Sequence, residues 1–228
     1  SVVFDEISQY DPKDSTSNPV KREKTFDSLN KDVKGLKLGV PNQYFEGIDK
    51  EVEKALNEAI EKYKSMGIEI ERFDLPEAKC ALPVYYVLAC AEASSNLARF
   101  DGVRYGFRAK EYKDINEMIC KTRSQGFGTE VKRRILLGNY VLSSGYYEAY
   151  YGKAQKLRQV ISNGFAKAFE KYDAILTPTS PVTAFPMGKS YKTPDEVYLA
   201  DICTVPVNIA GLPAVSVPCG FDSKNLPV

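Results

Sequence analysis

The sequence predicts an α/β protein in which helices flank a β-sheet. Residues 36–73 have the pattern strand, helix, strand with short joins. A long helical pattern over 146–172 leads into a short apolar run, Ala174–Leu176, and a second such run, Ala214–Val217, lies between prolines. Because a strand–helix–strand unit joins parallel strands through a right-handed crossover, the first pattern predicts a parallel pair.

The strand–helix–strand unit has clear boundaries. Leu36–Val40 alternates in polarity and stops at Pro41, and Ile68–Phe73 alternates in the same way. Asp49 can cap the helix between them, and Gly67 can close it. The apolar face of this helix repeats at helical spacing and consists of Val52, Leu56, Ala59, Ile60 and Tyr63.

Three further helices are predicted in the middle of the chain, over Leu82–Arg99 (beginning after Pro83), Asp114–Thr122 and Glu130–Leu142. Residues 1–34 are polar and charged, and we expect an exposed, partly mobile connection with at most the end of a helix over Val2–Tyr10. Residues 35–228 would form the folded domain.

Composition excludes several classes of function. The 228 residues are 43% hydrophobic and 27% charged with a net charge of +1, so bulk charge does not indicate a nucleic-acid or membrane surface. No apolar run approaches the roughly 20 residues that span a bilayer. The chain has no histidine, which excludes Ser-His-Asp and Cys-His catalysis and argues against zinc.

The five cysteines are scattered, and no two have metal-ligand spacing. We expect reduced, mostly buried thiols in a cytoplasmic protein. The cysteines are Cys80, Cys90, Cys120, Cys203 and Cys219.

The stretch 173–220 has the composition of a pocket wall. Small polar or glycine residues (Asp201, Thr204, Asn208 and Gly211) are interspersed with aliphatic ones. This pattern is typical of a small-molecule pocket with a few inward polar groups, although an ordinary buried loop is the slightly better interpretation of these residues alone. Asp201 stands between Ala200 and Ile202, so it must either be exposed or meet a cation from the protein or from a ligand.

Two other stretches carry reactive residue types. Ser94 and Ser95 lack the Gly-x-Ser-x-Gly turn of a nucleophile, so small packing residues are the better interpretation. The run Arg123–Gly138 holds several basic residues, which indicate either a solvated helix face or one arginine that turns inward to bind a carboxylate. Arg134 precedes an apolar run and is placed for partial burial.

Paired tyrosines and the end of one predicted strand are the remaining candidates for a functional site. Adjacent tyrosines on a helix point about 100° apart, so one of a pair such as Tyr85 and Tyr86 can pack in the core while the other faces a cleft. Thr177–Pro181 ends a predicted strand, where open α/β sheets collect ligands. No combination of these residues supplies a nucleophile together with its base.

Four strings carry a family resemblance: EASSNLARFDGVRYGFR, RSQGFGTEVKRRILLGNYVLSSGYYEAYYGKAQKLR, ILTPTSP and DICTVPVNIAGLPAVSVPCG. They resemble the amidase-signature family, and within it the glutamine-hydrolysing A subunits of tRNA-dependent amidotransferases. The resemblance implies a large mixed β-sheet flanked by helices and a Ser–cis-Ser–Lys triad. This sequence holds neither the triad lysine nor the Gly/Ser-rich loop, so it resembles the C-terminal portion of the domain, with an incomplete sheet. We expect it to be inactive alone.

The resemblance also implies roles for three residues. Arg134 resembles the clamp for the α-carboxylate of glutamine, Asp201 the acceptor for its α-ammonium, and Tyr85 a wall residue beside them. A zwitterionic amino acid needs one fixed cation and one fixed anion, which agrees with the chemistry of these side chains.

Partners are implied in the same way. The intact subunit would work in a cytoplasmic heterotrimer with the B and C subunits, without a membrane and without a cofactor of its own. The B subunit would use ATP and Mg²⁺ and bind Glu-tRNA(Gln). Two alternatives remain: an amidase of the same family that acts on other amides, and a non-catalytic scaffold whose helices over Glu130–Tyr172 dock a partner.

Overall fold

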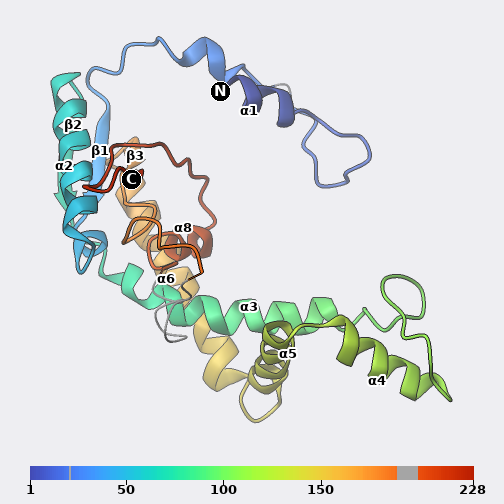
Figure 1. Ribbon diagram of the computed structural model, residues 1–228. Coiled ribbons are helices and arrows are strands. Elements are labelled where there is room, and N and C mark those ends of the chain that lie inside the picture. Colours follow the sequence, from blue (N-terminus) through green and yellow to red (C-terminus); the bar gives the residue numbers. More distant parts are fainter. Residues whose placement is uncertain (21, 189–199) are drawn as a thin grey trace.

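The computed structural model describes residues 1–20, 22–188 and 200–228 (Figure 1). Its strands are β1 (Lys37–Pro41), β2 (Glu69–Phe73) and β3 (Ala174–Ile175). Its helices are α1 (Val2–Ile7), α2 (Lys50–Ser65), α3 (Ala81–Leu97), α4 (Ile115–Gly126), α5 (Thr129–Leu142), α6 (Lys153–Phe169) and α8 (Val205–Ala210). Short 3-10 turns η1 (Thr25–Ser28), η2 (Asn42–Phe45) and η3 (Pro76–Cys80) and a π-helical turn, η4 (Glu148–Gly152), join them.

The three strands form a parallel sheet in the order β2-β1-β3. Lys37 lies opposite Glu69, and Leu38 opposite Ala174. The short β3 is extended by the amide of Leu176, which donates to the carbonyl of Gly39 at 2.9 Å. The predicted parallel pair and the strand at Ala174 are therefore confirmed, as is an α/β fold with helices beside a small sheet.

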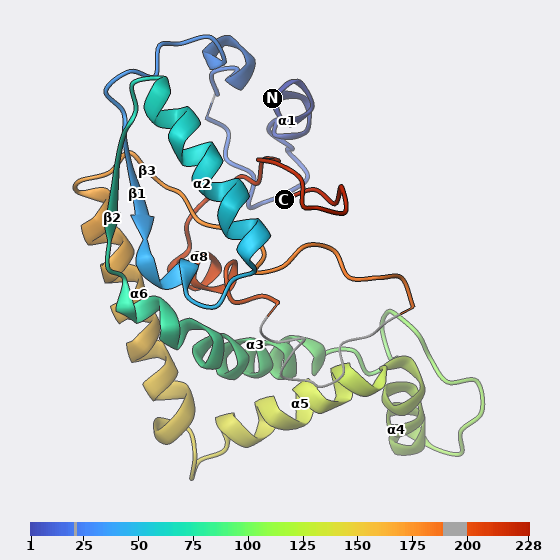
Figure 2. The ribbon, with the colours of Figure 1, turned by 60° about the vertical axis from the view of Figure 1, so that its left-hand side comes forward.

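Helix α2 joins β1 to β2 and is bounded as predicted. The Asp49 carboxylate accepts the amide of Glu51 at 2.8 Å, which satisfies one of the free donors of the first turn. Gly67, at a φ of +84°, turns the chain into β2 with a backbone conformation that suits glycine. The buried side chains of α2 are Val52, Ala55, Leu56 and Ile60. Figure 2 shows α2 running alongside the sheet.

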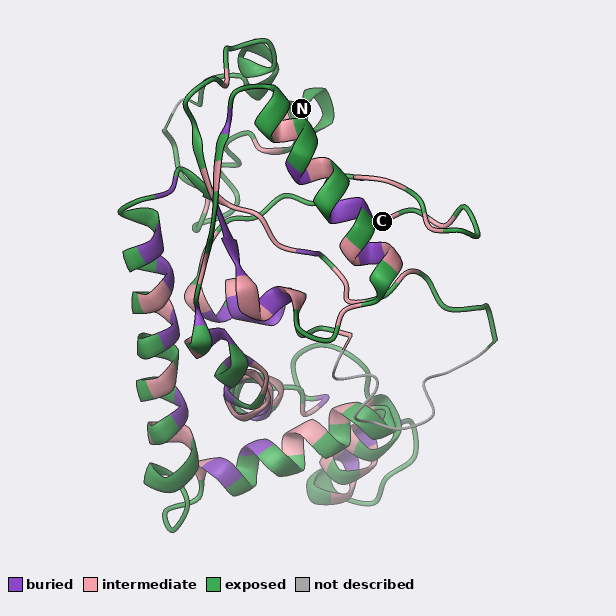
Figure 3. Cartoon of the chain, turned by 90° about the vertical axis from the view of Figure 1, so that its left-hand side faces the viewer, coloured by how far each residue is buried: buried purple, intermediate pink, exposed green. Residues whose placement is uncertain are grey.

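The helices α3, α5, α6 and α8 make up a second, all-helical region, which we call the helical layer. Helix α3 packs against α5, α6 and α8, and α6 packs against α8. Buried residues follow one side of the long helices (Figure 3). The core of this layer includes Leu88 of α3, Ile161 and Phe165 of α6 and Ile209 of α8. Burial of these apolar side chains is the main favourable contribution to its stability.

Three predicted helices have other bounds than expected: α4 continues past Thr122 to Gly126, and the other two differ at their starts. Helix α3 begins at Ala81 rather than after Pro83, because proline is tolerated in the first turn, where amides have no intrahelical acceptor. The single helix predicted over 146–172 is interrupted. The amide of Gly152 donates to the carbonyl of Tyr147 at 2.8 Å, a π-type bond, and the regular helix begins only at Lys153.

The strand predicted at Ala214–Val217 is also absent. The run has no regular secondary structure and forms no ladder, and Val215 is 86% exposed. A strand needs a neighbour to supply its hydrogen bonds, and no described strand lies beside this run. Beyond it, the chain turns back on itself, and Phe221 and Pro227 form an isolated antiparallel bridge.

The N-terminal residues match the expected exposed connection. No described residue of 1–34 is buried, and the helix is limited to Val2–Ile7. The Asp5 carboxylate joins α1 to η1 by accepting the amide and hydroxyl of Thr25 at 2.8 and 2.6 Å. This segment folds locally but adds nothing to the core. Within the described ranges, no helix has both the length and the apolar character needed to cross a membrane.

Candidate functional site

The candidate site lies where α3 and α5 approach each other. An ideal Cβ on Gly138 of α5 would come within 2.0 Å of the carbonyl oxygen of Cys90 on α3, so only glycine permits this spacing. Beside it, the Ser94 hydroxyl, which is buried, donates to the Asn139 side chain at 2.7 Å. The close contact fixes the position of Arg134, one helical turn before Gly138.

Arg134 and Tyr85 come together across this interface. Tyr85 lies on α3 and packs against the core of the helical layer, and its ring meets that of Tyr86 edge-on with centroids 5.1 Å apart. The Arg134 pKa is raised, first by the hydrogen bond to Glu130 and also by the Tyr85 phenol, while burial opposes the shift. The structure therefore brings two of the three predicted site residues into one neighbourhood.

Glu130 is a third member of the site that sequence reasoning missed. Its Oε1 accepts from Nε of Arg134 at 3.0 Å, and its Oε2 accepts from Nη1 of Arg133 at 3.0 Å. An acid four residues before an arginine on one helix is the spacing at which such pairs form, and this signal was present in the sequence.

The site also affects a nearby thiol. Burial raises the pKa of Cys90, whereas the positive charge of Arg134 lowers it. Arg134 therefore lies close enough to α3 for its charge to act on Cys90. An arginine only one-third exposed in its side chain, beside a packed interface, is more than a solvated helix residue.

Asp201 lies apart from this pair in its contacts. It is exposed and precedes α8, where its backbone carbonyl accepts the amides of Thr204 and Val205 at 3.1 and 3.0 Å. Its carboxylate makes no hydrogen bond or ion pair with another residue in the part of the chain that the structure describes. Its role as an ammonium acceptor stays a prediction.

The predicted pocket wall around Asp201 is not built as expected. Asn208 and Gly211 are exposed, while Val205 and Ile209 are buried. In a six-residue helix the apolar side chains take the side that faces α3 and α6, which leaves the polar ones at the surface. The Asn208 amide is used locally, because it donates to the Thr204 carbonyl at 2.9 Å.

Other candidates have structural roles. The buried Ser94 confirms the interpretation of that serine as a packing residue, whereas Ser95 is exposed and does not pack. After β3, the Thr179 hydroxyl lies 3.0 Å from that of Ser216, so the end of this strand contacts the C-terminal run. Arg123 donates to the carbonyls of Leu97 and Phe100, which holds the excursion between α3 and α4 in place.

The cysteines are less buried than predicted. All five are free, and Cys90 and Cys203 are buried, but Cys80 and Cys120 are exposed and Cys219 is intermediate. Among the described residues, no group of three or more potential ligands gathers as a metal site requires.

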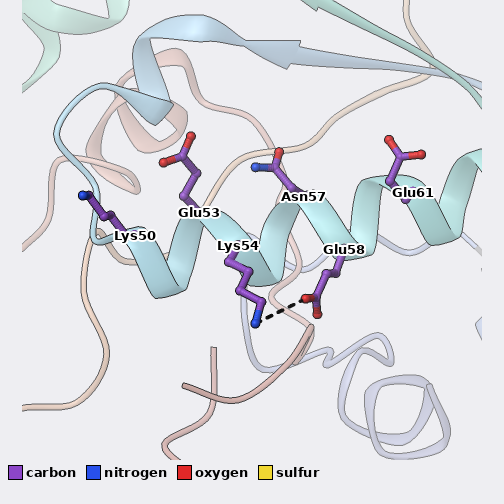
Figure 4. A pocket seen from close by; sticks show the side chains of 6 residues that line it. All are labelled: Lys50, Glu53, Lys54, Asn57, Glu58 and Glu61. Carbon is purple, nitrogen blue, oxygen red and sulfur yellow. Dashed lines mark ion pairs between the residues drawn. The ribbon is translucent and has the colours of Figure 1, made fainter. Parts of the chain in front are cut away.

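A surface hollow lies elsewhere, along α2 (Figure 4). Its lining is Lys50, Glu53, Lys54, Asn57, Glu58 and Glu61. Lys54 and Glu58 form an ion pair at 3.9 Å, and both side chains are largely exposed. The hollow is the charged outer face of a helix and includes none of the predicted site residues.

Comparison with known proteins places this geometry in a family. A family model described as "Amidase" matches residues 1–228. The A subunit of glutamyl-tRNA(Gln) amidotransferase from Ruminiclostridium cellulolyticum is 54% identical over 100% of this chain, and that from Thermodesulfovibrio yellowstonii is 53% identical over 100%. In both comparisons the chain spans 47% of the relative, so it represents about half the length of these proteins.

Solved structures agree. The crystal structure of the A subunit of glutamyl-tRNA(Gln) amidotransferase from Thermotoga maritima is 42% identical, with a TM-score of 0.68 over 96% of this chain and 42% of that one. A complex described as revealing the origins of an s-triazine catabolic enzyme has a TM-score of 0.69 at 20% identity over 100% of this chain and 45% of that one, which supports the fold alone.

Proposed function

This chain belongs to the amidase family, and from that premise we propose that it forms part of the glutamine-hydrolysing subunit of a glutamyl-tRNA(Gln) amidotransferase. The observation that carries the proposal is identity above 50% over the whole chain to A subunits of that enzyme. The matched region includes the helices that hold Tyr85 and Arg134. The intact subunit would be an amidotransferase, classed as a ligase.

The chemistry of the site supports glutamine as substrate. Arg134 presents a guanidinium at a packed interface, and such a group binds a carboxylate through two parallel hydrogen bonds. Tyr85 lies beside it and supplies both a ring surface and a hydroxyl. Asp201, unpaired among the described residues, would accept the α-ammonium group.

The remaining steps are assigned to other parts of the enzyme. In this proposal a Ser–cis-Ser–Lys triad outside the matched half attacks the side-chain amide, forms an acyl-enzyme and releases ammonia. The B and C subunits complete a cytoplasmic heterotrimer. ATP, Mg²⁺ and Glu-tRNA(Gln) are bound by the B subunit, which converts the tRNA-bound glutamate to glutamine. The chain itself needs no cofactor for glutamine binding.

Arg134→Ala tests the proposal in the protein extended to the full length of its relatives. We expect kcat/KM for glutamine to fall about 100-fold or more, because a bidentate charged contact is lost. Ammonia release, measured with a coupled assay, gives the rate, and circular dichroism checks the fold. Lys132→Ala is the matched control, since it removes a nearby cation on the same helix whose ammonium group donates to the Ser124 carbonyl.

Three results would refute the assignment: glutamine turnover unchanged by Arg134→Ala, a preference of the unmodified protein for simple aliphatic amides over glutamine, or no amide hydrolysis at all. The second would favour another amidase of the family. The third would favour a scaffold.

A further inference from the structure

Glu130 occupies one of the hydrogen-bond donors of Arg134 and leaves others free, and this affects how Arg134 can bind a substrate. The contact runs from Nε of Arg134 to one carboxylate oxygen of Glu130 at 3.0 Å. A guanidinium has five N–H donors in a planar fork, and the edge formed by its two terminal nitrogens lies away from Nε. Glu130 therefore takes the inner edge and leaves the outer edge for another acceptor.

The second oxygen of Glu130 is already in use. It accepts from Arg133 at 3.0 Å, so each oxygen of this carboxylate faces a different arginine. The carboxylate cannot easily rotate to meet Arg134 with both oxygens without giving up Arg133. This arrangement limits Glu130 to a single contact with Arg134 and prevents a closed bidentate pair.

We propose that Glu130 is a positioning residue: it holds Arg134 by Nε so that the two terminal nitrogens face the α-carboxylate of the substrate. The inference rests on the proposed function, because it assumes that Arg134 binds that carboxylate. An arginine side chain loses rotamer freedom when it is fixed in one orientation. A partner that fixes the side chain before the substrate arrives removes part of this cost from binding.

The surroundings of the pair favour orientation over stability as the role of Glu130. The side chains of Arg134 and Glu130 are 33% and 49% exposed, and ion pairs in such positions add little to folding. Tyr85 approaches the same guanidinium from α3, so the group is confined from two helices. The opposite role would make Glu130 a substitute for the substrate, which must be displaced before glutamine binds.

The test compares glutamine with 4-aminobutanamide, which has the same side-chain amide and amino group but no α-carboxylate. In the full-length protein, we expect Glu130→Ala to raise KM for glutamine about tenfold while kcat changes by less than about twofold. The kinetics of 4-aminobutanamide hydrolysis should stay within about twofold of those of the unmodified protein. Glu130→Gln, whose amide oxygen can still accept from Nε, should give a smaller rise in KM.

Arg133→Ala and Arg134→Ala separate this inference from the proposed function. Arg133→Ala frees the second oxygen of Glu130 to close a bidentate pair with Arg134, so it should raise KM for glutamine and leave 4-aminobutanamide hydrolysis unaffected. If Arg134→Ala abolishes glutamine turnover but Glu130→Ala leaves KM unchanged or lowers it, the positioning role is wrong and the proposed function stands. Equal losses on both substrates in Glu130→Ala would also refute it, because they indicate a structural defect. If Arg134→Ala has no effect on glutamine, the proposed function and the positioning role fail together.

Discussion

The helical layer and the C-terminal stretch Leu212–Val228 contain similarly apolar sequence but reach different states. In the helical layer, side chains such as Phe165 and Ile161 are almost completely buried. In the C-terminal stretch, Val215 and Val217 are exposed, and no ladder forms. A helix satisfies its backbone within itself, whereas a strand depends on a neighbour. An apolar segment can therefore pack into the core as a helix without help from a neighbour, whereas an apolar segment that would form a strand needs a neighbouring strand first.

The few fixed points of the C-terminal stretch are polar. The Ser223 amide and hydroxyl both donate to the Glu51 carboxylate at 2.6 Å, which ties the chain end to the first turn of α2. The Asp222 carboxylate accepts the amides of Lys224 and Leu226 at 2.8 Å, and these bonds help to lower its pKa. This stretch is held by a few side-chain contacts, and the helical layer by its core.

The largest difference in the free energy of unfolding should come from truncating a side chain in the core of the helical layer. Phe165→Ala removes a ring that is 2% exposed and should reduce the free energy of unfolding by about 3–5 kcal/mol. Phe169→Ala, one turn further along α6 and 40% exposed, is the control and should cost less than about 1 kcal/mol. Urea denaturation measures both. Equal losses would mean that α6 is not the centre of the helical layer.

A smaller effect is expected at the α3–α5 contact. Gly138→Ala places a Cβ against the carbonyl of Cys90, so the helices must move apart, at a cost of about 1–3 kcal/mol. Gly145→Ala, where no atom lies within 4 Å of the added Cβ, should leave the melting temperature nearly unchanged. If both variants melt alike, the close approach of α3 and α5 is not required for folding.

The rates at which Cys203 and Cys219 are chemically modified give a second comparison of the two regions. Burial raises the pKa of Cys203, which is 3% exposed beside the helical core, to about 11. Cys219, in the C-terminal stretch, is only partly buried, so iodoacetamide should modify it well before Cys203. Mass spectrometry of timed samples gives the order. Faster modification of Cys203 would contradict its place in the core.

The same shift predicts a dependence of stability on pH. An unfolded cysteine ionises near its ordinary value of 9.0, while native Cys203 keeps its proton to about 11. The native state then binds more protons between these values, so the free energy of unfolding falls as pH rises from about 9 to about 11. Below pH 9 the contribution is fully present. Cys203→Ala should flatten this slope in denaturation curves measured across that range, and an unchanged slope would assign the effect to other groups.

The smallest effect is expected at Val215. Val215→Ser should change the free energy of unfolding by less than about 0.5 kcal/mol, because the side chain is already exposed. It should also reduce self-association of the chain, since unpaired extended apolar segments favour aggregation. Light scattering at rising concentration measures this. A clear loss of stability would show that the stretch packs in solution.

The sequence predicted the features that depend on local rules. The cap at Asp49, the turn at Gly67 and the parallel pair all follow from side-chain chemistry within a few residues. The prediction of a strand at Ala214–Val217 was wrong, because a strand forms only beside a neighbouring strand, which the local sequence does not specify. The break before Lys153 was missed because the helical period continues through it.

The roles of the candidate site residues stay predictions. Tyr85 and Arg134 were named from a resemblance, and the structure brings them together. Glu130 was overlooked although its spacing from Arg134 is a known helix pairing. The role of Asp201 stays a prediction, because its carboxylate contacts no partner among the described residues.

The π-helical turn at Glu148–Gly152 has a consequence for tolerance to deletions. Such a turn accommodates one residue more than an α-helical turn of the same length. Removal of a single residue there would let regular α-helical bonding run through, without shifting α6. Tyr146, whose ring centroid lies 4.3 Å from that of Tyr140, would then be carried about 100° around the helix axis and lose this contact. One residue thus sets which aromatic rings stack at this corner of the molecule.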